Sequence, residues 1–274
     1  MTEGAPTFDP NDPGHVAVFD EQPLWSAQAG LLLLEDVPLG VRRALDLGCG
    51  AGFPLFELAE RLGSGAFVVG LDPWDAALRR AALKKRTWGV PHASLVRGDG
   101  ARMPFRDGSL ELVVSNLGVN NFADPDTVLG EVRRVLTLEG TLAFTTNRQG
   151  HFDELYEVFA SVLASRDDAA ALERLRVHVE HRGTLASVTE RLERCGFRVV
   201  SVHERMVAMR FANGRAIFDH HFLRLGFVPA WREVSGERAE SVFDDVRAEL
   251  DRRALAADGL RLTVPLVSIL ARPA

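Results

Sequence analysis

Cysteine is scarce in this chain of 274 residues, which holds only Cys49 and Cys195. Cys49 falls in a glycine-rich turn, and Cys195 stands just before Gly196, which ends a predicted helix. Disulfide frameworks and cysteine-based metal sites need more cysteines, at characteristic spacings. His178 and His181 have neither a cysteine nor an ordered acid cluster to join them, so the sequence predicts no metal site.

Long hydrophobic runs are also lacking. The run Leu31–Leu34 is far shorter than the roughly 20 apolar residues that cross a bilayer. The N-terminal residues do not resemble a signal peptide. We therefore expect a soluble, cytoplasmic protein with no membrane partner.

An excess of positive charge is absent as well. Lys and Arg number 32 against 38 Asp and Glu, which gives a net charge of -6. Such a chain has no overall basic field for a phosphate backbone, so we expect no nucleic-acid partner. One dense basic patch lies between Arg79 and Arg86 on a predicted amphipathic helix. We interpret it as a solvated helix face, with a partner site as the alternative.

The most informative feature present is the segment Ala44–Gly52. An apolar strand reaches Asp46 and passes into a turn with three alternate glycines, and a helix is predicted from Pro54. Glycines after a strand let the backbone turn sharply and approach a ligand closely. The free N–H groups of the next helix then face that ligand. This pattern predicts a binding turn.

A second apolar strand, Phe67–Asp72, ends in an acid about twenty residues after that turn. Nucleotide-binding α/β folds place an acid there to accept hydrogen bonds from ribose hydroxyls. Dinucleotide sites need a third glycine where this chain has Phe53. The bulky side chain argues against a pyrophosphate and for a ligand that lacks one.

From about Val41 to Asn147, the chain resembles class I S-adenosylmethionine-dependent methyltransferases of the small-molecule, methyltransferase-11-like group. Four motifs in the family's order carry the resemblance. They are Ala44–Gly52, Phe67–Asp72, Leu95–Asp99 with the adjoining Gly100–Phe105, and Leu110–Asn116.

Alternating predicted strands and helices indicate an α/β fold whose parallel sheet is covered on both faces. The resemblance implies a doubly wound, Rossmann-like sheet of seven mostly parallel strands in the order 3-2-1-4-5-7-6, with helical cap insertions. Pro265 has no N–H for a ladder, so we expect it at the start of the last strand or at a bulge. The strands are expected to end near Leu47, Leu71, Gly98, Ser115 and Thr146, with later strands over Phe197–Val202 and Val264–Leu270.

We expect one domain overall. Its Pro- and Asp-rich start is expected to be mobile, and a helix is predicted through Trp25 and Leu31–Leu34. The resemblance implies that this segment and two insertions cap the substrate. The segments are an N-terminal lid (1–40), the cofactor-binding core (41–147), a helical insertion (148–183), a core helix and strand (184–212), a second helical insertion (213–258) and the last strand (259–274).

The resemblance implies S-adenosylmethionine as cofactor. Asp46 would orient the turn or meet the methionyl ammonium through water, Asp72 would take both ribose hydroxyls, and Asp99 would accept from the adenine amino group. For each acid the alternative is an N-cap or turn role. The other implied cofactor contacts are Gly48, Cys49 (main chain only), Gly50, Gly52, Gly100, Ala101, Asn116 and Leu117.

Pro73 and Trp74 directly follow Asp72, so they are predicted to flank the adenine plane; alternatively, Trp74 covers the outer surface of its helix. Trp25 either closes over the methionyl end or packs its own helix. Asn120 and Asn121 either bind a polar substrate or make a turn. The substrate-side candidates are Trp25, Phe53, Asn120 and Asn121.

Methyl transfer from a sulfonium needs mainly positioning and exclusion of water, and positioning alone supplies roughly 7–11 kcal/mol. No catalytic residue is therefore required, and none is assigned. His220 and His221 are the candidates for a general base. As neighbours on a predicted helix, they point to different faces, so at most one would face a pocket. Tyr156 lies in an apolar stripe and is predicted to pack.

We therefore predict in-line methyl transfer to the oxygen, carbon or nitrogen of a small molecule. Ser115–Gly118 lacks the Asn/Asp-Pro-Pro-aromatic turn usual in enzymes that methylate nucleobase amines. The first alternative is a non-catalytic S-adenosylmethionine-binding regulator or partner protein, and the second is an NAD(P)-dependent oxidoreductase. A monomer and a homodimer both stay open, as does the identity of the acceptor.

Overall fold

The computed structural model describes residues 8–21 and 26–274. This part of the chain forms two compact units. The core unit holds residues 9–147, 184–205 and 266–274, and the helical unit holds Phe8 with residues 148–183 and 206–265. Within the described ranges, no helix combines the length and the apolar character that a membrane span needs.

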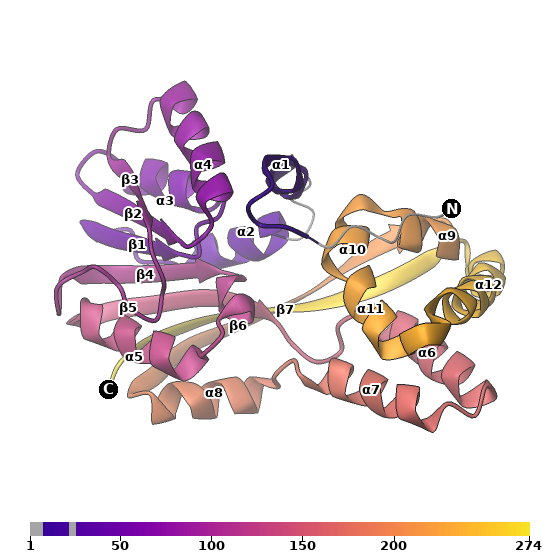
Figure 1. Cartoon of the computed structure of the whole chain (residues 1–274). Helices are drawn as coiled ribbons and strands as arrows, with labels where there is room; N and C mark the ends of the chain where they lie inside the picture. Colours follow the sequence, from indigo (N-terminus) through magenta and orange to yellow (C-terminus); the bar gives the residue numbers. More distant parts are fainter. Residues whose placement is uncertain (1–7, 22–25) are drawn as a thin grey trace. The chain divides into compact units, whose positions relative to one another are not determined.

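A seven-stranded sheet has the predicted order β3-β2-β1-β4-β5-β7-β6. Strand β1 pairs in parallel with β2 and β4, and further parallel pairs join β2 to β3 and β4 to β5 (Figure 1). Strand β7 runs antiparallel to β5. The strands are β1 (Arg43–Leu47), β2 (Phe67–Asp72), β3 (Ala93–Arg97), β4 (Leu110–Asn116), β5 (Leu136–Asn147), β6 (Phe197–Phe211) and β7 (Leu260–Pro273).

Two apolar clusters cover the two faces of the sheet in the core unit. Successive side chains of β1 point to opposite faces, so Leu45 joins one cluster and Ala44 the other. The continuous burial of β1 after Arg43 is typical of a strand covered on both sides. The Leu45 cluster includes α5 (Pro125–Val135) and α8 (Leu185–Arg194), and the Ala44 cluster includes α2 (Ser26–Asp36), α3 (Leu55–Leu62) and α4 (Asp75–Trp88).

The Pro- and Asp-rich start contains a helix, α1 (Pro13–Glu21), which was not predicted; the mobility expected of this start stays a prediction. The Asp12 carboxylate accepts hydrogen bonds from the amides of Gly14 (2.6 Å) and His15 (3.0 Å), which caps the helix N-terminus. Asp20 on α1 pairs with Arg80 (2.8 Å) and with Lys84 on α4. These two members of the basic patch therefore hold α1, and the prediction of a solvated face was wrong for them.

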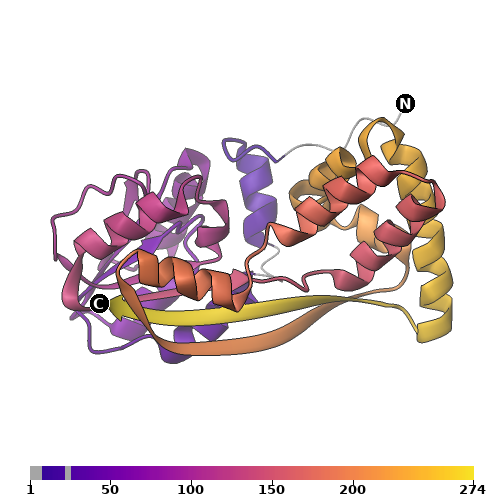
Figure 2. The same cartoon turned by 90° about the horizontal axis from the view of Figure 1, so that it is seen from below.

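Strands β6 and β7 are longer than predicted. They lie side by side in the sheet, and each runs from the core unit into the helical unit (Figure 2). Pro265 lies inside β7 rather than at its start, so the first of the two predicted placements was wrong, and the bulge stays a prediction. Pairing with β5 ends at Leu266, next to Pro265, so that ladder needs no proline N–H. The carbonyl of Pro265 accepts from the amide of Arg148 (3.2 Å).

Six helices pack around an aromatic core in the helical unit. Ring centroids lie 5.0 Å apart for Phe218 and Phe243 and 6.1 Å apart for Phe159 and Trp231. These helices are α6 (Asp153–Ser165), α7 (Ala169–Glu180), α9 (Gly214–Asp219), α10 (His221–Gly226), α11 (Val228–Ser235) and α12 (Ala239–Ala257).

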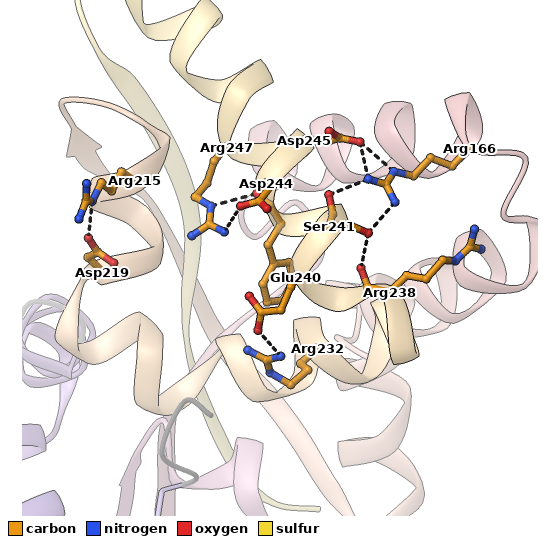
Figure 3. Close-up of polar contacts among 11 residues, drawn as sticks. Arg166, Arg215, Asp219, Arg232, Arg238, Glu240, Ser241, Asp244, Asp245 and Arg247 are labelled. Atoms are coloured by element: carbon orange, nitrogen blue, oxygen red, sulfur yellow. Dashed lines mark hydrogen bonds and ion pairs between the residues drawn. The ribbon is translucent and has the colours of Figure 1, made fainter. Parts of the chain in front are cut away.

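Ion pairs tie these helices together at the surface. The Arg166 guanidinium lies 2.8 Å from Asp245 on α12 and also donates to the Ser241 hydroxyl at 2.9 Å (Figure 3). Arg232 of α11 pairs with Glu240 of α12 at 2.7 Å. The single-domain arrangement and the cap role expected of the insertions stay predictions.

Candidate functional site

The glycine turn joins β1 to α3 at the carboxyl end of the sheet. Gly48, Gly50 and Gly52 all have positive φ, at 77°, 50° and 102°. The amides of Gly48 and Cys49 both donate to the Leu71 carbonyl, at 2.8 and 3.3 Å, so the turn is fastened to the neighbouring strand β2. Positive φ at three positions within five residues explains why the chain uses glycine there.

Close packing adds a second demand at Gly52. A Cβ placed on this residue would lie 2.2 Å from the Phe56 ring of α3, far inside van der Waals contact. At Gly48, a Cβ would lie 3.3 Å from the Cα of Gly118. The turn is therefore held tightly against α3 and the segment after β4.

Gly52→Ala should lower the free energy of unfolding by about 2–4 kcal/mol, because overpacking and an unfavourable φ each cost about 1–3 kcal/mol. Urea denaturation measures the loss. Gly89→Ala is the matched control, since Gly89 has a left-handed φ of 68° and a Cβ placed on it would meet no atom within 4 Å. If both variants lose the same free energy, the Phe56 contact is not what restricts residue 52.

Asp72 is 5% exposed at the end of β2. Its Oδ2 accepts from the Gly50 amide (2.8 Å) and its Oδ1 from the Trp74 amide (2.9 Å). Burial raises the pKa of this carboxyl, and the two amide bonds act in the opposite direction. Asp72 thus stabilises the turns around it, as the alternative interpretation of this acid predicted. Each oxygen keeps a second lone pair for a ligand hydroxyl.

Asp46 is fully buried below the same turn, with an exposed fraction of 0%. Neither of its carboxylate oxygens has a hydrogen-bond partner among the described residues. Burial raises its pKa to about 8, the Asp72 charge adds to the rise, and the Leu55 amide at the start of α3 opposes it weakly. An unpartnered buried carboxyl is costly unless it is neutral or finds a partner, so Asp46 does not stabilise the fold through a hydrogen bond to any described residue.

Cys49 lies in the turn with its thiol buried. Burial raises the pKa of this thiol well above its usual range, and the nearby Asp46 and Asp72 carboxyls act in the same direction. A thiol held protonated is a poor nucleophile. This agrees with the expectation that only its main chain serves the site.

Asp99 follows β3 and is exposed. Its Oδ1 accepts from the Ala101 amide at 2.9 Å, so the acid shapes its own turn. At Gly100, a Cβ would lie 3.2 Å from Leu47 and 3.3 Å from Val128. The turn after β3 therefore packs against the end of β1 and against α5.

The side chain of Asn116, at the end of β4, forms hydrogen bonds to two protein partners. Its Nδ2 donates to the Ser26 carbonyl (2.9 Å) and its Oδ1 accepts from the Thr145 hydroxyl (2.8 Å). The next residue, Leu117, has a left-handed φ of 60°. Asn116 thus anchors the start of α2 to the carboxyl end of the sheet, a role that the sequence did not reveal.

Phe53 and Gly30 make a second contact between the glycine turn and α2. A Cβ on Gly30 would lie 2.3 Å from the Phe53 ring and 3.1 Å from Nδ2 of Asn116. Phe53, a predicted substrate residue, therefore packs on α2. Trp25, its predicted companion, lies outside the described residues.

Asn120 belongs to a polar cluster at the ends of β4 and β5. Its Nδ2 donates to Oδ1 of Asn147 (2.8 Å), and its Oδ1 accepts from the Thr146 hydroxyl (2.5 Å). Asn121 is exposed beside it. Thr145–Asn147 were not predicted among the site residues. Three polar residues at the end of a buried strand next to β4 are typical of a ligand-binding edge of the sheet.

Pro73 is exposed, whereas Trp74 is partly buried against Val16, Ala76 and Ala77. Trp74 thus packs where α1 meets α4, which agrees with the covering role weighed for it. Stacking on an adenine stays a prediction.

The histidine candidates lie in the helical unit. They were expected on one helix, but α9 ends at Asp219 and α10 begins at His221, so His220 lies between two helices. Its ring meets Phe211 edge-on at 5.5 Å. Burial lowers the pKa of His220, and His221 acts in the same direction. His221 is exposed.

The core-unit residues fit an adenosyl sulfonium. The positive-φ turn exposes main chain rather than side chains, and Asp46 and Asp72 place two carboxyls beside it. Favourable partners for such carboxyls are a cation and hydroxyl donors. No group of three or more acids, histidines and cysteines is arranged for a metal within the described ranges.

Comparison with known proteins agrees with this chemistry. Residues 45–144 match the family model of a methyltransferase domain. Nocamycin O-methyltransferase of Saccharothrix syringae is 36% identical over 101 residues, which cover 37% of this chain and 36% of the relative. Demethylmenaquinone methyltransferase of Thermus thermophilus is 36% identical over 138 residues, or 49% of this chain and 60% of the relative. The chain thus matches only about a third to three fifths of these relatives' lengths.

The fold has solved counterparts. A putative methyltransferase from Bacillus halodurans superposes with a TM-score of 0.59 at 19% identity, over 90% of this chain and all of the other. This likeness shows the fold, and the family match covers the glycine turn and all three acids. Residues 45–144 are therefore a methyltransferase domain of the class I type, whose cofactor is S-adenosylmethionine.

Proposed function

We propose that the whole chain is an enzyme that transfers a methyl group from S-adenosylmethionine to the oxygen, carbon or nitrogen of a small molecule. The observation that carries this proposal is the pairing of the glycine turn with Asp46 and Asp72 inside the matched domain. Two relatives whose names describe methylation of small molecules support the acceptor class.

The cofactor brings a methyl group on a sulfonium with a good leaving group built in. In our proposal, the main chain of Gly48, Gly50 and Gly52 holds the methionyl part. Asp72 accepts from the ribose with the lone pairs left free by its two amide bonds. Asp46, buried and without a partner among the described residues, lies where the methionyl ammonium would bind, and that cation would favour the ionised carboxylate.

The remaining assignments follow from position in the fold. Asp99, Gly100 and Ala101 form the turn proposed to receive the adenine, beside Pro73 and Trp74. Cys49, Asn116 and Leu117 complete the proposed cofactor contacts, and Asn120 and Asn121 are the proposed polar contacts of the acceptor.

Catalysis in this proposal is positioning in a dry site rather than acid–base chemistry. Effective positioning supplies roughly 7–11 kcal/mol of barrier reduction, enough to require no dedicated base. Asp46 has the buried, unpartnered carboxyl among the described residues of the core-unit site, and it lies below the glycine turn with a pKa of about 8. His220 and His221 stay candidates only.

Isothermal titration tests the cofactor assignment. S-adenosylhomocysteine should bind at micromolar concentration, whereas NADPH should not. A second experiment follows labelled methyl groups from S-adenosylmethionine to a panel of small acceptors. Tight binding of NADPH alone would favour an oxidoreductase. Cofactor binding without any transfer, together with a stable complex with another protein, would favour a non-catalytic regulator.

A further inference from the structure

Helix α7 contacts both α6 and α11 in the helical unit (Figure 1). Polar side chains of these three helices meet in a buried cluster. Tyr156 of α6 is 4% exposed. Its hydroxyl lies 3.0 Å from Nε2 of His178 on α7 and accepts from the indole N–H of Trp231 on α11 at 3.2 Å. Neither contact was foreseen for a tyrosine expected only to pack.

Two further groups follow just after the end of α7, one beside His178 and one beside the Tyr156 hydroxyl. The ring of His181 lies 5.4 Å from that of His178, and its Nδ1 contacts the His178 carbonyl. Arg182 follows and is partly buried. Its guanidinium interacts with the Tyr156 hydroxyl and lowers the pKa of that group, against the larger, raising effect of burial.

Arg182 differs from the other arginines of this unit. Arg166 pairs with Asp245 and Arg247 with Asp244, as Figure 3 shows for the α12 surface. Arg238 pairs with Asp168 in the same unit. Arg182, by contrast, forms no ion pair with any carboxylate in residues 8–21 or 26–274.

The surroundings of Arg182 leave its charge uncompensated. Burial lowers its pKa, and only Tyr156 opposes that effect. Burial also lowers the pKa of His178 to about 4, with further lowering by Arg182 and His181. Buried charges in proteins are normally paired. The guanidinium and the His178 imidazole lie at one neutral hydroxyl; His151 is close enough to interact with both groups, and His181 with His178. The charge of Asp153 acts on Tyr156, but among the described residues Asp153 forms no ion pair with Arg182.

We propose that Arg182, His178, His181 and Tyr156 form a binding site for an oxyanion, namely the carboxylate or phosphate group of a small-molecule ligand. A guanidinium offers two parallel N–H groups that match such an oxyanion. The imidazoles add N–H donors. The hydrogen bond from Trp231 to Tyr156 holds the tyrosine hydroxyl in position beside the site. All four residues belong to the helical unit, and none is among the proposed cofactor contacts.

Thermal unfolding of the full chain tests the site. The protein is melted in phosphate-free buffer, then with sodium phosphate or sodium acetate, against sodium chloride of equal ionic strength. At ten times its Kd, a bound anion should raise Tm by about 3–5 °C. Phosphate alone raising Tm would indicate a phosphate ligand, and acetate alone a carboxylate ligand. No specific rise with either anion overturns the proposal.

Three variants locate the effect. Arg182→Gln should lose the anion-dependent rise, and Arg182→Lys should keep part of it, because lysine keeps the charge without the fork. Arg224→Gln is the control, since Arg224 is exposed on α10 and its loss changes the net charge equally. A full response in Arg182→Gln would contradict the proposal. If Arg182→Gln does not fold, a full anion-dependent rise in Tm in Arg182→Lys would contradict the proposal.

Nuclear magnetic resonance of the histidine side chains measures the pKa of His178. Anion binding should change this pKa, whereas a purely structural role of the cluster would not. Saturating phosphate or acetate, whichever raises Tm, should raise the pKa of His178 from about 4 toward its ordinary value of 6.5, because the anion favours the imidazolium. A rise in Tm with no change at His178 would mean that the anion binds elsewhere, which also overturns the proposal.

Discussion

An Asp46→Asn variant should be more stable than the wild-type chain at pH 7.5 by roughly 2–5 kcal/mol, and its advantage should vanish near pH 4. The carboxyl is fully buried without a hydrogen-bond partner among the described residues, and burial raises its pKa from 3.8 to about 8. Asparagine keeps the shape of the side chain and carries no charge at any pH.

The sign follows from proton binding. Between about pH 4 and pH 8 the unfolded chain has lost the Asp46 proton, whereas the folded chain keeps it. Stability from this group is therefore fully present below pH 4 and is lost as pH rises toward 8. A tenfold difference in proton affinity is worth about 1.4 kcal/mol, so the full stability difference is on the order of 5 kcal/mol. Structural relaxation around the ionised carboxylate would reduce this difference.

Urea denaturation at several pH values between 4 and 8 measures the difference between the two proteins. Asp126→Asn serves as the control, because Asp126 is exposed and pairs with Arg191 at the surface. The difference in unfolding free energy between Asp46→Asn and Asp126→Asn should grow steadily as pH rises. A stability difference for Asp46→Asn that does not depend on pH would show that burial does not hold this carboxyl neutral.

Asp72→Ala should bind S-adenosylhomocysteine about 10- to 150-fold more weakly, which corresponds to roughly 1.5–3 kcal/mol, the scale of lost charge-assisted hydrogen bonds. Two losses contribute. The ribose loses its proposed acceptor, and the amides of Gly50 and Trp74 lose theirs, which loosens the glycine turn.

Two further variants separate these losses. Asp72→Asn keeps one acceptor oxygen and should fall between alanine and wild type. Asp75→Ala removes an acid three residues later, on the exposed start of α4 where it pairs with Arg79, and should bind like wild type. Isothermal titration gives all three affinities. Unchanged binding by a folded Asp72→Ala protein would leave Asp72 as a turn acid alone.

The core of this fold could be read from the sequence because its signals are local and repeated. Apolar strands such as Phe67–Asp72 alternate with helices of 3.6-residue period, and positive φ at Gly48, Gly50 and Gly52 is available almost only to glycine. The predicted strand order matched, since it rests on the family's motif order.

The errors share a different physical origin, which is tertiary pairing. Strand β6 continues to Phe211 through charged residues because it lies at the edge of the sheet, where few side chains are buried. Helix α1 is short, and its sequence has little amphipathic periodicity. Its Asp20 pairs with Arg80 and Lys84 of α4, a helix about sixty residues away in the sequence. Such partners are not visible in a local window.

Site geometry was predictable only in part. The position of Asp46 was clear from its motif, but its complete burial was not, and that burial determines its charge. Asn116 was assigned to the cofactor, yet it holds Ser26 and Thr145. The cluster around Arg182 joins three helices through side chains that no sequence motif connects.

The most direct test is a crystal structure of the chain with S-adenosylhomocysteine. It should show the ribose hydroxyls within hydrogen-bond distance of Asp72 and the methionyl group on the main chain of Gly48–Gly52, above Asp46. Clear density for the molecule at any other place, or a glycine turn that stays empty at saturating concentration, would contradict the account.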